Sequence, residues 1–368
     1  MEALVIGGTG PTGPFIVRGL LERGYSGSVR NRGTHDTPEI PDSVERIKGD
    51  PHFKETLSEA LAGRRFDIIV ATYGRIRYVA EVGAAHTDRL STGGGSPGIK
   101  GARQPEQVFP AGARTPLPDD APRSETPEEI HFGYLARISE DAVMDRHAAG
   151  DYVGTHLRYP IIYGPRQLRP SEWWVMRRIM DGRDYIVLPD SGLTMITRGY
   201  SENMAEAVLC AVDRPDASAG QIYNCGDVHQ LTLAQWVEVI GAPMGASLEV
   251  HAVPGPLAYS ARDLMISRQT SHHQLFDMHK IRAELEYEDK VPVLDALART
   301  VRFYQDSPPD ETEEMKANLA LHYQTEDEMV KIVERTRVAL EAVPHIDPDY
   351  RHPYAHPKKP GEKDHHGR

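Results

Sequence analysis

The chain has 368 residues and a formal net charge of -12 at pH 7, which argues against nucleic acid as the main partner, because binding phosphates requires a basic face. Its two cysteines, Cys210 and Cys225, are too few for a disulfide framework. No apolar run approaches the ~20 residues that span a bilayer, and Met1-Glu2 is not followed by a signal-peptide pattern, so we expect a cytoplasmic protein without a membrane partner.

The first two dozen residues predict a strand, a glycine turn and a helix. The apolar run from Ala3 to Ile6 leads into a glycine-rich stretch, and a helical pattern follows up to Gly24. Glycines allow a tight turn, and they let a pyrophosphate lie against backbone N–H groups at the positive end of a helix. We therefore expect a nucleotide cofactor to contact Gly7, Thr9, Gly10, Pro11, Thr12 and Gly13.

The second strand is expected to end near Asn31. Dinucleotide-binding folds place an acidic residue there for the ribose 2′-OH, or a basic residue nearby for a 2′-phosphate. This chain offers Asn31 and Arg32 and no carboxylate, which favours NADP over NAD. The alternative is that Arg32 only opens a solvated loop.

Residues 52–62 predict a helix, and Phe66 to Ala71 predict a buried strand, because a continuous apolar run is typical of a parallel sheet covered on both faces. Ala71 and Tyr73 then fall at the carboxyl end of this strand. Ligands bind at that edge of open α/β sheets. We expect Tyr73 to form a wall of the cofactor or substrate cleft.

Several segments resemble the extended short-chain dehydrogenase/reductase family, also called the NAD-dependent epimerase/dehydratase family. The resemblance spans roughly residues 1–305 and is carried by the GxxGxxG spacing of residues 7–13, the strand 66–71, the run LRYPIIYGP at 157–165, and segments 220–226 and 232–236. It implies an α/β fold with a Rossmann-type doubly wound parallel sheet over residues 1–165. A smaller α/β substrate-binding portion over 166–305 would return some elements to this sheet, and 306–368 would form a helical extension and tail.

The same resemblance implies further roles. Asp50 matches a position that often contacts the adenine amino group, and Pro160 and Ile161 match the segment that holds the nicotinamide carboxamide. Members of the family usually form homodimers, so a homodimer is expected here. Their catalytic Ser or Thr follows the fifth strand, where this chain has a glycine-rich loop over 89–101; Thr92 is the first candidate and Ser96 the second. The proline-rich residues 101–128 are expected to lie over the site.

The family's central pair, Tyr-x-x-x-Lys on one helix, is absent from this chain. In that pair the lysine lowers the tyrosine pKa and holds the nicotinamide ribose, and the tyrosine transfers a proton to or from the substrate oxygen. Gly133 and Glu140 fix the register of the pattern Tyr-Gly-x-x-Lys-x-x-x-Glu. They place Phe132 where the tyrosine belongs and Ala136 where the lysine belongs.

Three explanations of this loss stay open. Tyr134 substitutes as the proton donor, with Lys100 brought in from the glycine loop, although two residues along a helix point in roughly opposite directions. Alternatively, the cleft performs a redox-neutral isomerisation, dehydration or cyclisation with Tyr73, His131 or Tyr134 as acid or base. In the third, the chain binds a cofactor without catalysis. We favour an atypical NAD(P)-binding enzyme acting on a small carbonyl, hydroxyl or nucleotide-sugar substrate.

The remaining candidates lie in the substrate-binding portion. Trp174, near the start of a helix, forms either an apolar wall of the substrate pocket or part of the core. Arg198 either pairs with an anionic substrate group or is a surface charge at a helix start. His272 and His273 lack a completing ligand pattern, so no metal site is expected. Residues 310–343 predict a charged helix, followed by a tail without a core pattern.

Overall fold

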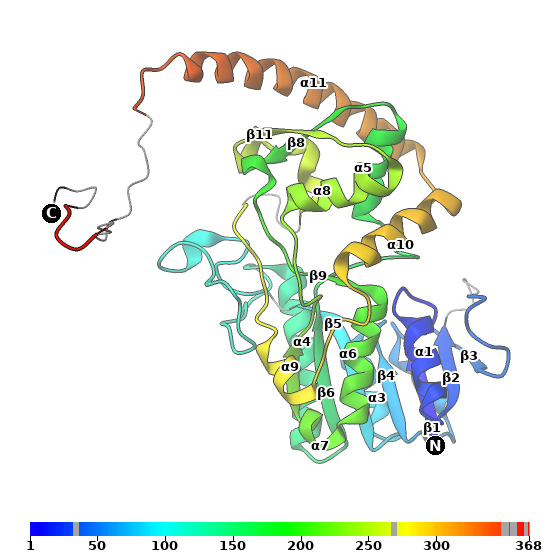
Figure 1. Cartoon of the computed structure of the whole chain (residues 1–368). Coiled ribbons are helices and arrows are strands. Elements are labelled where there is room, and N and C mark those ends of the chain that lie inside the picture. The colour runs from blue at the N-terminus through cyan, green and yellow to red at the C-terminus, as the bar shows by residue number, and fades with distance from the viewer. Residues whose placement is uncertain are drawn as a thin grey trace.

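A seven-stranded parallel sheet forms the centre of the molecule (Figure 1). The computed structural model describes residues 1–31, 37–96, 98–265 and 271–346, together with 353, 359–363 and 367. Neighbouring strands follow the order β10-β6-β5-β4-β1-β2-β3, and every adjacent pair is parallel. The strands are β1 (Glu2–Ile6), β2 (Ser26–Asn31), β3 (Glu45–Lys48), β4 (Ile68–Ala71), β5 (Arg89–Gly95), β6 (Val153–Tyr159) and β10 (Gln221–Asn224).

Helices cover both faces of this sheet, which confirms the predicted doubly wound fold (Figure 1). One face packs against α1 (Gly13–Glu22) and α6 (Ser201–Asp213), and the other against α2 (Lys54–Leu61), α3 (Ile76–Gly83) and α4 (His131–Ala148). Successive side chains of a strand point to opposite faces of the sheet, and helices cover both faces. The central strands are therefore apolar along their whole length. Val5 and Val70 belong to the core below α1 and α6, whereas Leu4 and Ile69 belong to the core below α3.

A second hydrophobic core lies beyond the carboxyl edge of the sheet (Figure 1). It is formed by α5 (Ser171–Met180), β8 (Tyr185–Pro189), α8 (Leu233–Gly241), β11 (Glu249–Val253) and α10 (Val293–Asp306). Here β8 pairs with β11, and β7 (Ile161–Tyr163) pairs with β9 (Arg198–Tyr200), both in parallel. Strand β10 returns to the sheet beside β6. The remaining short helices are α7 (Pro215–Ser218) and α9 (His279–Leu285).

The predicted helical extension is present as α11 (Glu313–Glu341), a helix of 29 residues. A buried ion pair joins it to the second core, with Arg178 Nη2 at 2.6 Å from Glu326 Oε1. Most of the tail after residue 346 lies outside the described residues. Within the described ranges, none of the helices combines the length and the apolar composition that a bilayer span requires.

Candidate functional site

The glycine turn between β1 and α1 lies at the carboxyl edge of the sheet. Gly7 has a φ of 98°, and a Cβ on it would lie 2.7 Å from the Tyr73 Cβ. A Cβ on Gly13 would lie 2.2 Å from the carbonyl carbon of Gly8. Gly7 thus lets the turn pack against the end of β4, and Gly13 lets the turn close on itself. A Cβ on Gly10 would meet only the Gly7 carbonyl oxygen, at 3.3 Å. The turn is therefore open to a ligand on the Gly10 side.

The beginning of α1 leaves several backbone donors open. The N–H groups of Thr9, Thr12 and Phe15 have no hydrogen-bond partner among the described residues, and Pro11 and Pro14 have no N–H at all. Open donors at the positive end of a helix are suited to a phosphate group. The residues present thus fit the pyrophosphate of a dinucleotide.

The residues at the end of β2 decide which ribose substituent can be accommodated. Asn31 ends this strand, while its side chain and the whole of Arg32 lie outside the described residues. Arg30 is fully buried; its Nη2 donates to the Thr56 carbonyl at 2.8 Å and its Nη1 to the Leu57 carbonyl at 3.4 Å. Burial lowers the pKa of Arg30. Because α2 carbonyls hold its guanidinium, Arg30 is not a partner for a 2′-phosphate.

His52 lies between Asp50 and Tyr73 and contacts both of them. The Oδ1 of Asp50 accepts a hydrogen bond from the His52 backbone N–H at 2.9 Å and lies 2.7 Å from its Nδ1. The His52 ring meets the Tyr73 ring edge-on, with centroids 5.0 Å apart. Tyr73 follows Ala71 at the end of β4 and is partly exposed, as expected for a cleft wall.

The glycines after Thr92 correct one sequence expectation, because they do not form a loop. Residues 89–95 pair with both β4 and β6 as strand β5. A Cβ on Gly93 would lie 2.8 Å from the Tyr159 ring, on Gly94 3.1 Å from the His156 ring, and on Gly95 2.8 Å from the Phe132 ring. These glycines therefore give space to large neighbouring side chains within the sheet.

The register expected for α4 is consistent with its packing. A Cβ on Gly133 would lie 2.3 Å from the Gly98 backbone nitrogen, so the helix approaches the β5 loop at this residue. Glu140 is fully buried and accepts hydrogen bonds from Arg158, at 2.6 Å from Nε and 2.8 Å from Nη2. About two turns before Glu140, in the first turn of α4, Phe132 is 59% exposed and supplies no hydroxyl.

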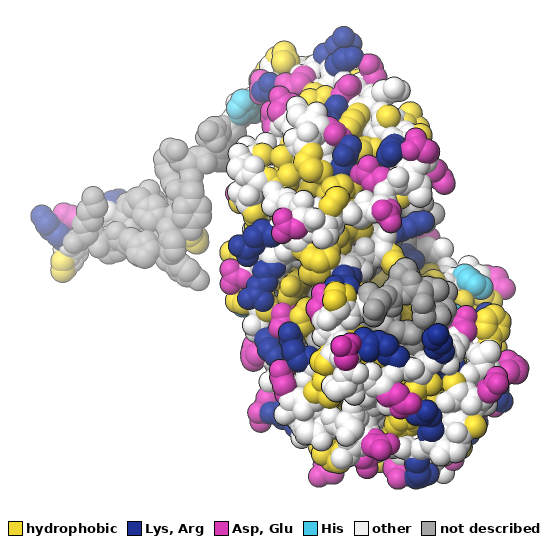
Figure 2. All heavy atoms as spheres, turned by 90° about the vertical axis from the view of Figure 1, so that its right-hand side faces the viewer, with side chains coloured by type: hydrophobic (Ala, Val, Ile, Leu, Met, Phe, Trp, Pro, Cys, Tyr) yellow, Lys and Arg dark blue, Asp and Glu magenta, His cyan; other side chains and the backbone are white. Residues whose placement is uncertain are grey.

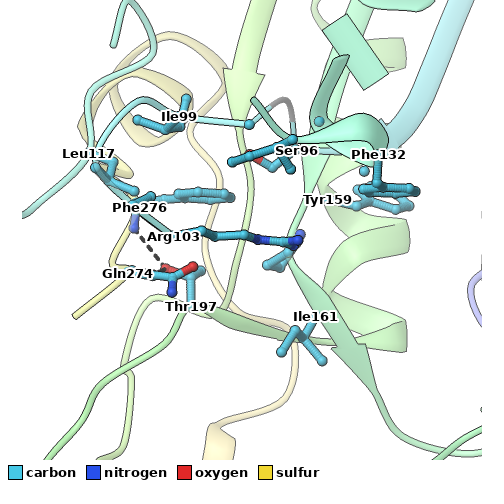
Figure 3. Close-up of a pocket in the computed structure, with 16 residues that line it drawn as sticks. Ser96, Ile99, Arg103, Leu117, Phe132, Tyr159, Ile161, Thr197, Gln274 and Phe276 are labelled. Carbon is cyan, nitrogen blue, oxygen red and sulfur yellow. Dashed lines mark hydrogen bonds between the residues drawn. The ribbon is translucent and has the colours of Figure 1, made fainter. Parts of the chain in front are cut away.

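Phe132 lies between two cavities at the carboxyl edge of the sheet. The first, which we call the arginine cavity, has a volume of about 210 Å³ and contains the side chain of Arg103 (Figure 3). Residues that line it are Gly95, Ser96, Gly98, Ile99, Ala102, Arg103, Leu117, Ile130, Phe132, Gly133, Tyr159, Pro160, Ile161, Thr197, Gln274 and Phe276. It is largely apolar, which is typical of small-molecule sites.

The second, more open cavity, which we call the histidine cavity, has a volume of about 630 Å³. Its lining includes Tyr73, Ala136, Ser139 and His156. The His156 Nδ1 lies 2.7 Å from the Thr92 Oγ1, and its Nε2 is buried with no partner among the described residues. Burial lowers the pKa of His156 to about 4, so this imidazole is neutral near pH 7.

The three catalytic candidates do not come together at these cavities. Thr92 is fully buried inside β5, where its hydroxyl is engaged by His156. The guanidinium of Arg137 lies over the Tyr134 ring, 5.4 Å from its centroid. Lys100 Nζ donates to Glu125 Oε1 at 2.9 Å. None of Thr92, Tyr134 and Lys100 lines either cavity, so the geometry does not favour a relocated Tyr134–Lys100 pair.

The substrate candidates divide in the same way. Ser96, Pro160 and Ile161 all line the arginine cavity. Trp174 packs against the second core and lines neither cavity. Arg198 is 5% exposed, which corrects the surface-charge alternative.

Arg198 is held by structural contacts. Its Nη2 donates to the Leu264 carbonyl at 2.6 Å, and its Nη1 donates to Ser171 Oγ at 3.1 Å. Its guanidinium also lies 4.4 Å from the Trp236 ring centroid. These contacts assign Arg198 to the support of the second core.

The sequence did not single out Arg103 or His156. Arg103 lies in the irregular excursion after β5, and His156 lies inside an ordinary buried strand. The one available signal was a run of polar residues, Thr155, His156 and Arg158, in a strand that the resemblance places inside the sheet. Among the described residues, no group of three His, Cys, Asp or Glu side chains could hold a metal ion.

Comparisons with known proteins agree with this architecture. A model described as the NAD dependent epimerase/dehydratase family matches residues 105–226. The resemblance to the NAD-dependent epimerase/dehydratase family is confirmed. The residues of this chain that the family model matches include Phe132 and Ala136 but not the glycine turn. No curated protein matches the chain at a significant level of sequence similarity.

Solved structures of epimerases and dehydratases share the fold. A UDP-glucose 4-epimerase from Thermotoga maritima with UDP-glucose has a TM-score of 0.66 at 17% identity, covering 83% of this chain and 99% of its own. UDP-glucose 4-epimerase from Thermus thermophilus, in complex with NAD, has a TM-score of 0.63 at 19% sequence identity, and the match covers 83% of this chain and 100% of the epimerase. DesIV, a dTDP-glucose 4,6-dehydratase from Streptomyces venezuelae, has a TM-score of 0.61 at 19% sequence identity, and the match covers 83% of this chain and 98% of the dehydratase.

Proposed function

We propose that the protein binds a nicotinamide dinucleotide along the carboxyl edge of its sheet and converts a small carbonyl or hydroxyl substrate beside it. This proposal is carried by the open Gly10 side of the glycine turn, together with the N–H groups of Thr9, Thr12 and Phe15 at the start of α1, which have no partner among the described residues. The Thermus thermophilus epimerase and DesIV structures contain NAD, and the family description names it. The cofactor supplies the hydride chemistry when it is bound.

The residues of this chain have distinct roles in that arrangement. Backbone donors of Thr9, Thr12 and Phe15 bind the pyrophosphate, and Asp50 lies toward the adenine. Pro160 and Ile161 border the nicotinamide end of the cleft, at the wall of the arginine cavity. The apolar side chains of that cavity exclude water from the reacting atoms. Phe132 covers Gly95 and provides no proton.

We further propose NADP as the preferred cofactor, because Asn31 and Arg32 stand in the sequence where an NAD-binding chain has a carboxylate, and because the guanidinium of Arg30, the preceding cation, is held by α2 carbonyls. Replacing Arg32 by Glu should then reduce affinity for NADPH far more than affinity for NADH.

A homodimer, a cytoplasmic location and the division of the chain at residues 165 and 305 stay predictions. Figure 2 shows acidic and basic side chains interspersed over one face of the molecule, a pattern that offers no nucleic acid a continuous basic surface.

Fluorescence titration with NADPH and NADH tests the cofactor proposal, using Gly10→Ala as the decisive variant. The added methyl group needs only a small shift of the Gly7 carbonyl and otherwise points into the ligand space, so we expect a folded protein with at least tenfold weaker dinucleotide binding. Gly83→Ala is the matched control, since its methyl group would meet only Ile69 Cδ1 at 3.9 Å. Equal binding by parent and Gly10→Ala would refute the site.

A redox-neutral reaction in the same cleft is the second candidate, and the buried Nε2 of His156 favours it. When the Thr92 hydroxyl donates to the Thr155 carbonyl, at 3.3 Å, the His156 Nδ1–H donates to Thr92 and Nε2 keeps a free lone pair. His156 is one of the residues that line the histidine cavity. A neutral imidazole with a free lone pair can accept a proton, and the lowered pKa makes His156 a weaker base than an ordinary histidine. Neither catalytic group of the family pair is needed for that step.

Substrate screens can separate the two candidates by the redox state of the dinucleotide. Conversion of a substrate without change in absorbance at 340 nm, lost in His156→Gln, would support the redox-neutral reaction. Conversion coupled to NADPH oxidation and retained in His156→Gln would support hydride transfer. If dinucleotide binds and neither variant nor parent converts any member of a broad screen, the non-catalytic explanation becomes the best account.

A further inference from the structure

Arg103 is the one charged side chain among the described residues that line the arginine cavity. Its guanidinium extends across the cavity toward the side formed by Tyr159 and Ile161 (Figure 3). It forms no hydrogen bond or ion pair with another described residue. Desolvation lowers the pKa of Arg103, and no neighbouring carboxylate opposes that shift. The cavity therefore contains an unpaired cation.

The surroundings of this cation are mostly hydrocarbon. An unpaired guanidinium loses hydration there without compensation, and an anion that enters the cavity restores its partners. The apolar walls give the rest of such a ligand a surface to bury. The side chains that form them are Ile99, Ala102, Leu117, Ile130, Phe132, Pro160, Ile161 and Phe276.

A second polar group faces the same space. Gln274 is 8% exposed, lines the cavity beside Thr197, and its side-chain amide has no partner among the described residues. The Thr197 hydroxyl is already engaged, since it accepts a hydrogen bond from the Phe276 backbone N–H at 2.7 Å. Arg103 and Gln274 together provide donors for one small anionic group with an attached polar atom.

We propose that the arginine cavity binds the carboxylate of a small acid with an apolar body, held by Arg103 and Gln274. This identity of the substrate rests on the proposed function, in which the cavity is the substrate site. A carboxylate has one charge and a planar shape that matches the guanidinium with two parallel hydrogen bonds. The glycine turn does not line the cavity, so the pyrophosphate of a dinucleotide is not the partner of Arg103.

A nucleotide sugar is a poorer match to this space. The volume of about 210 Å³ corresponds to about seven water molecules, at about 30 Å³ each, which is far fewer than the non-hydrogen atoms of a nucleotide sugar. A diphosphate brings at least two charges, and Arg103 is the single cation in the lining. The preference thus departs from the UDP-glucose named with the Thermotoga maritima structure.

Calorimetric titration with benzoate, phenylpyruvate and 4-methyl-2-oxopentanoate tests the proposal. Benzamide is the neutral counterpart of benzoate, and UDP-glucose is the competing ligand class. We expect at least one acid to bind the parent, and Arg103→Gln to weaken it by about tenfold to a hundredfold. Arg103→Lys should fall between, because it keeps the charge and loses the planar fork. Arg114→Gln, in the same excursion but exposed and outside the cavity lining, should bind like the parent.

Thermal unfolding separates ligand binding from a structural role. Because Arg103 has no hydrogen-bond or ion-pair partner among the described residues, Arg103→Gln should unfold at the same temperature as the parent or higher. A marked loss of stability would assign Arg103 to the fold and overturn the proposal. So would equal binding of benzoate and benzamide, unchanged binding in Arg103→Gln, binding of UDP-glucose alone, or failure of all three acids to bind.

Parallel NADPH titration keeps the two proposals apart. Acid binding that depends on Arg103, in a protein that binds no dinucleotide, would end the cofactor proposal and leave the anion site standing. Dinucleotide binding without acid binding would do the reverse.

Discussion

Replacing Glu172 by Gln should change how stability depends on pH. Glu172 lies in the first turn of α5, is fully buried, and neither of its carboxylate oxygens has a partner among the described residues. Burial raises its pKa from an ordinary value of 4.5 to about 7, while the charge of Arg198 opposes the shift. Between these two pKa values the folded protein holds a proton that the unfolded chain has released.

The sign and size of the effect follow from this linkage. A raised pKa stabilises the folded state fully below the unfolded pKa, and the contribution is lost as pH rises through the folded pKa. The slope approaches about 1.4 kcal/mol per pH unit between the two pKa values and flattens near each of them, so raising the pH from 5 to 7 should cost about 2 kcal/mol at this group. Glu172→Gln cannot ionise and should lack this loss.

Urea unfolding of parent and variant at pH 5, 6, 7 and 8 measures the difference directly, because contributions from other titrating groups cancel. The free energy of unfolding of Glu172→Gln minus that of the parent should increase with pH up to about pH 7 and then level off. Glu59→Gln, at an exposed helical position, is the control and should follow the parent. Parallel curves for parent and Glu172→Gln would refute the assigned pKa and the burial that causes it.

Three further substitutions test the packing around the site. Glu326→Ala leaves the buried Arg178 unpaired, so we expect a loss of about 3–5 kcal/mol in urea unfolding, largely recovered when Arg178→Met is added. For Glu140, burial alone would raise the pKa, but the hydrogen bond and the charge of Arg158 outweigh burial and hold the pKa below its ordinary value. The ionised carboxylate therefore stabilises the folded state above an ordinary glutamate pKa, and this stabilisation is lost as the pH falls. Glu140→Gln should lack this acid-dependent loss in a pH series of thermal midpoints. Gly133→Ala forces its methyl group into the backbone of the β5 loop and should lower stability by about 1–3 kcal/mol, and an unchanged thermal midpoint would contradict the close approach.

The sheet and the glycine turn could be predicted because local chemistry determines them. Val5, Val70, Leu4 and Ile69 alternate between two cores, and this alternation produces the continuous apolar runs that indicate central strands. The turn needs glycine at Gly13 because the backbone of the same turn occupies the space of a Cβ. Both signals lie within a few residues of one another in the sequence.

The chemistry of the site depends on neighbours that are distant in sequence, and the sequence could not place them. Gly93 to Gly95 have a composition typical of a loop, yet they form a strand because Tyr159, His156 and Phe132 fill the volume that side chains would have taken. Arg103 gains its significance from apolar residues of several separate segments, and no local pattern indicates that it lacks a partner. The hydroxyl of Thr92 was predicted as catalytic from its position alone, whereas pairing with β6 buries it.

Mass spectrometry of small molecules released on denaturation tests the cofactor site most directly, with Gly10→Ala prepared in parallel. Both proteins are first incubated with the dinucleotides and desalted. We expect a nicotinamide dinucleotide, with the phosphorylated form more abundant, to be released from the parent and to be depleted in Gly10→Ala. Absence of dinucleotide from the parent under those conditions, or equal amounts from both proteins, would contradict the cofactor site at the glycine turn.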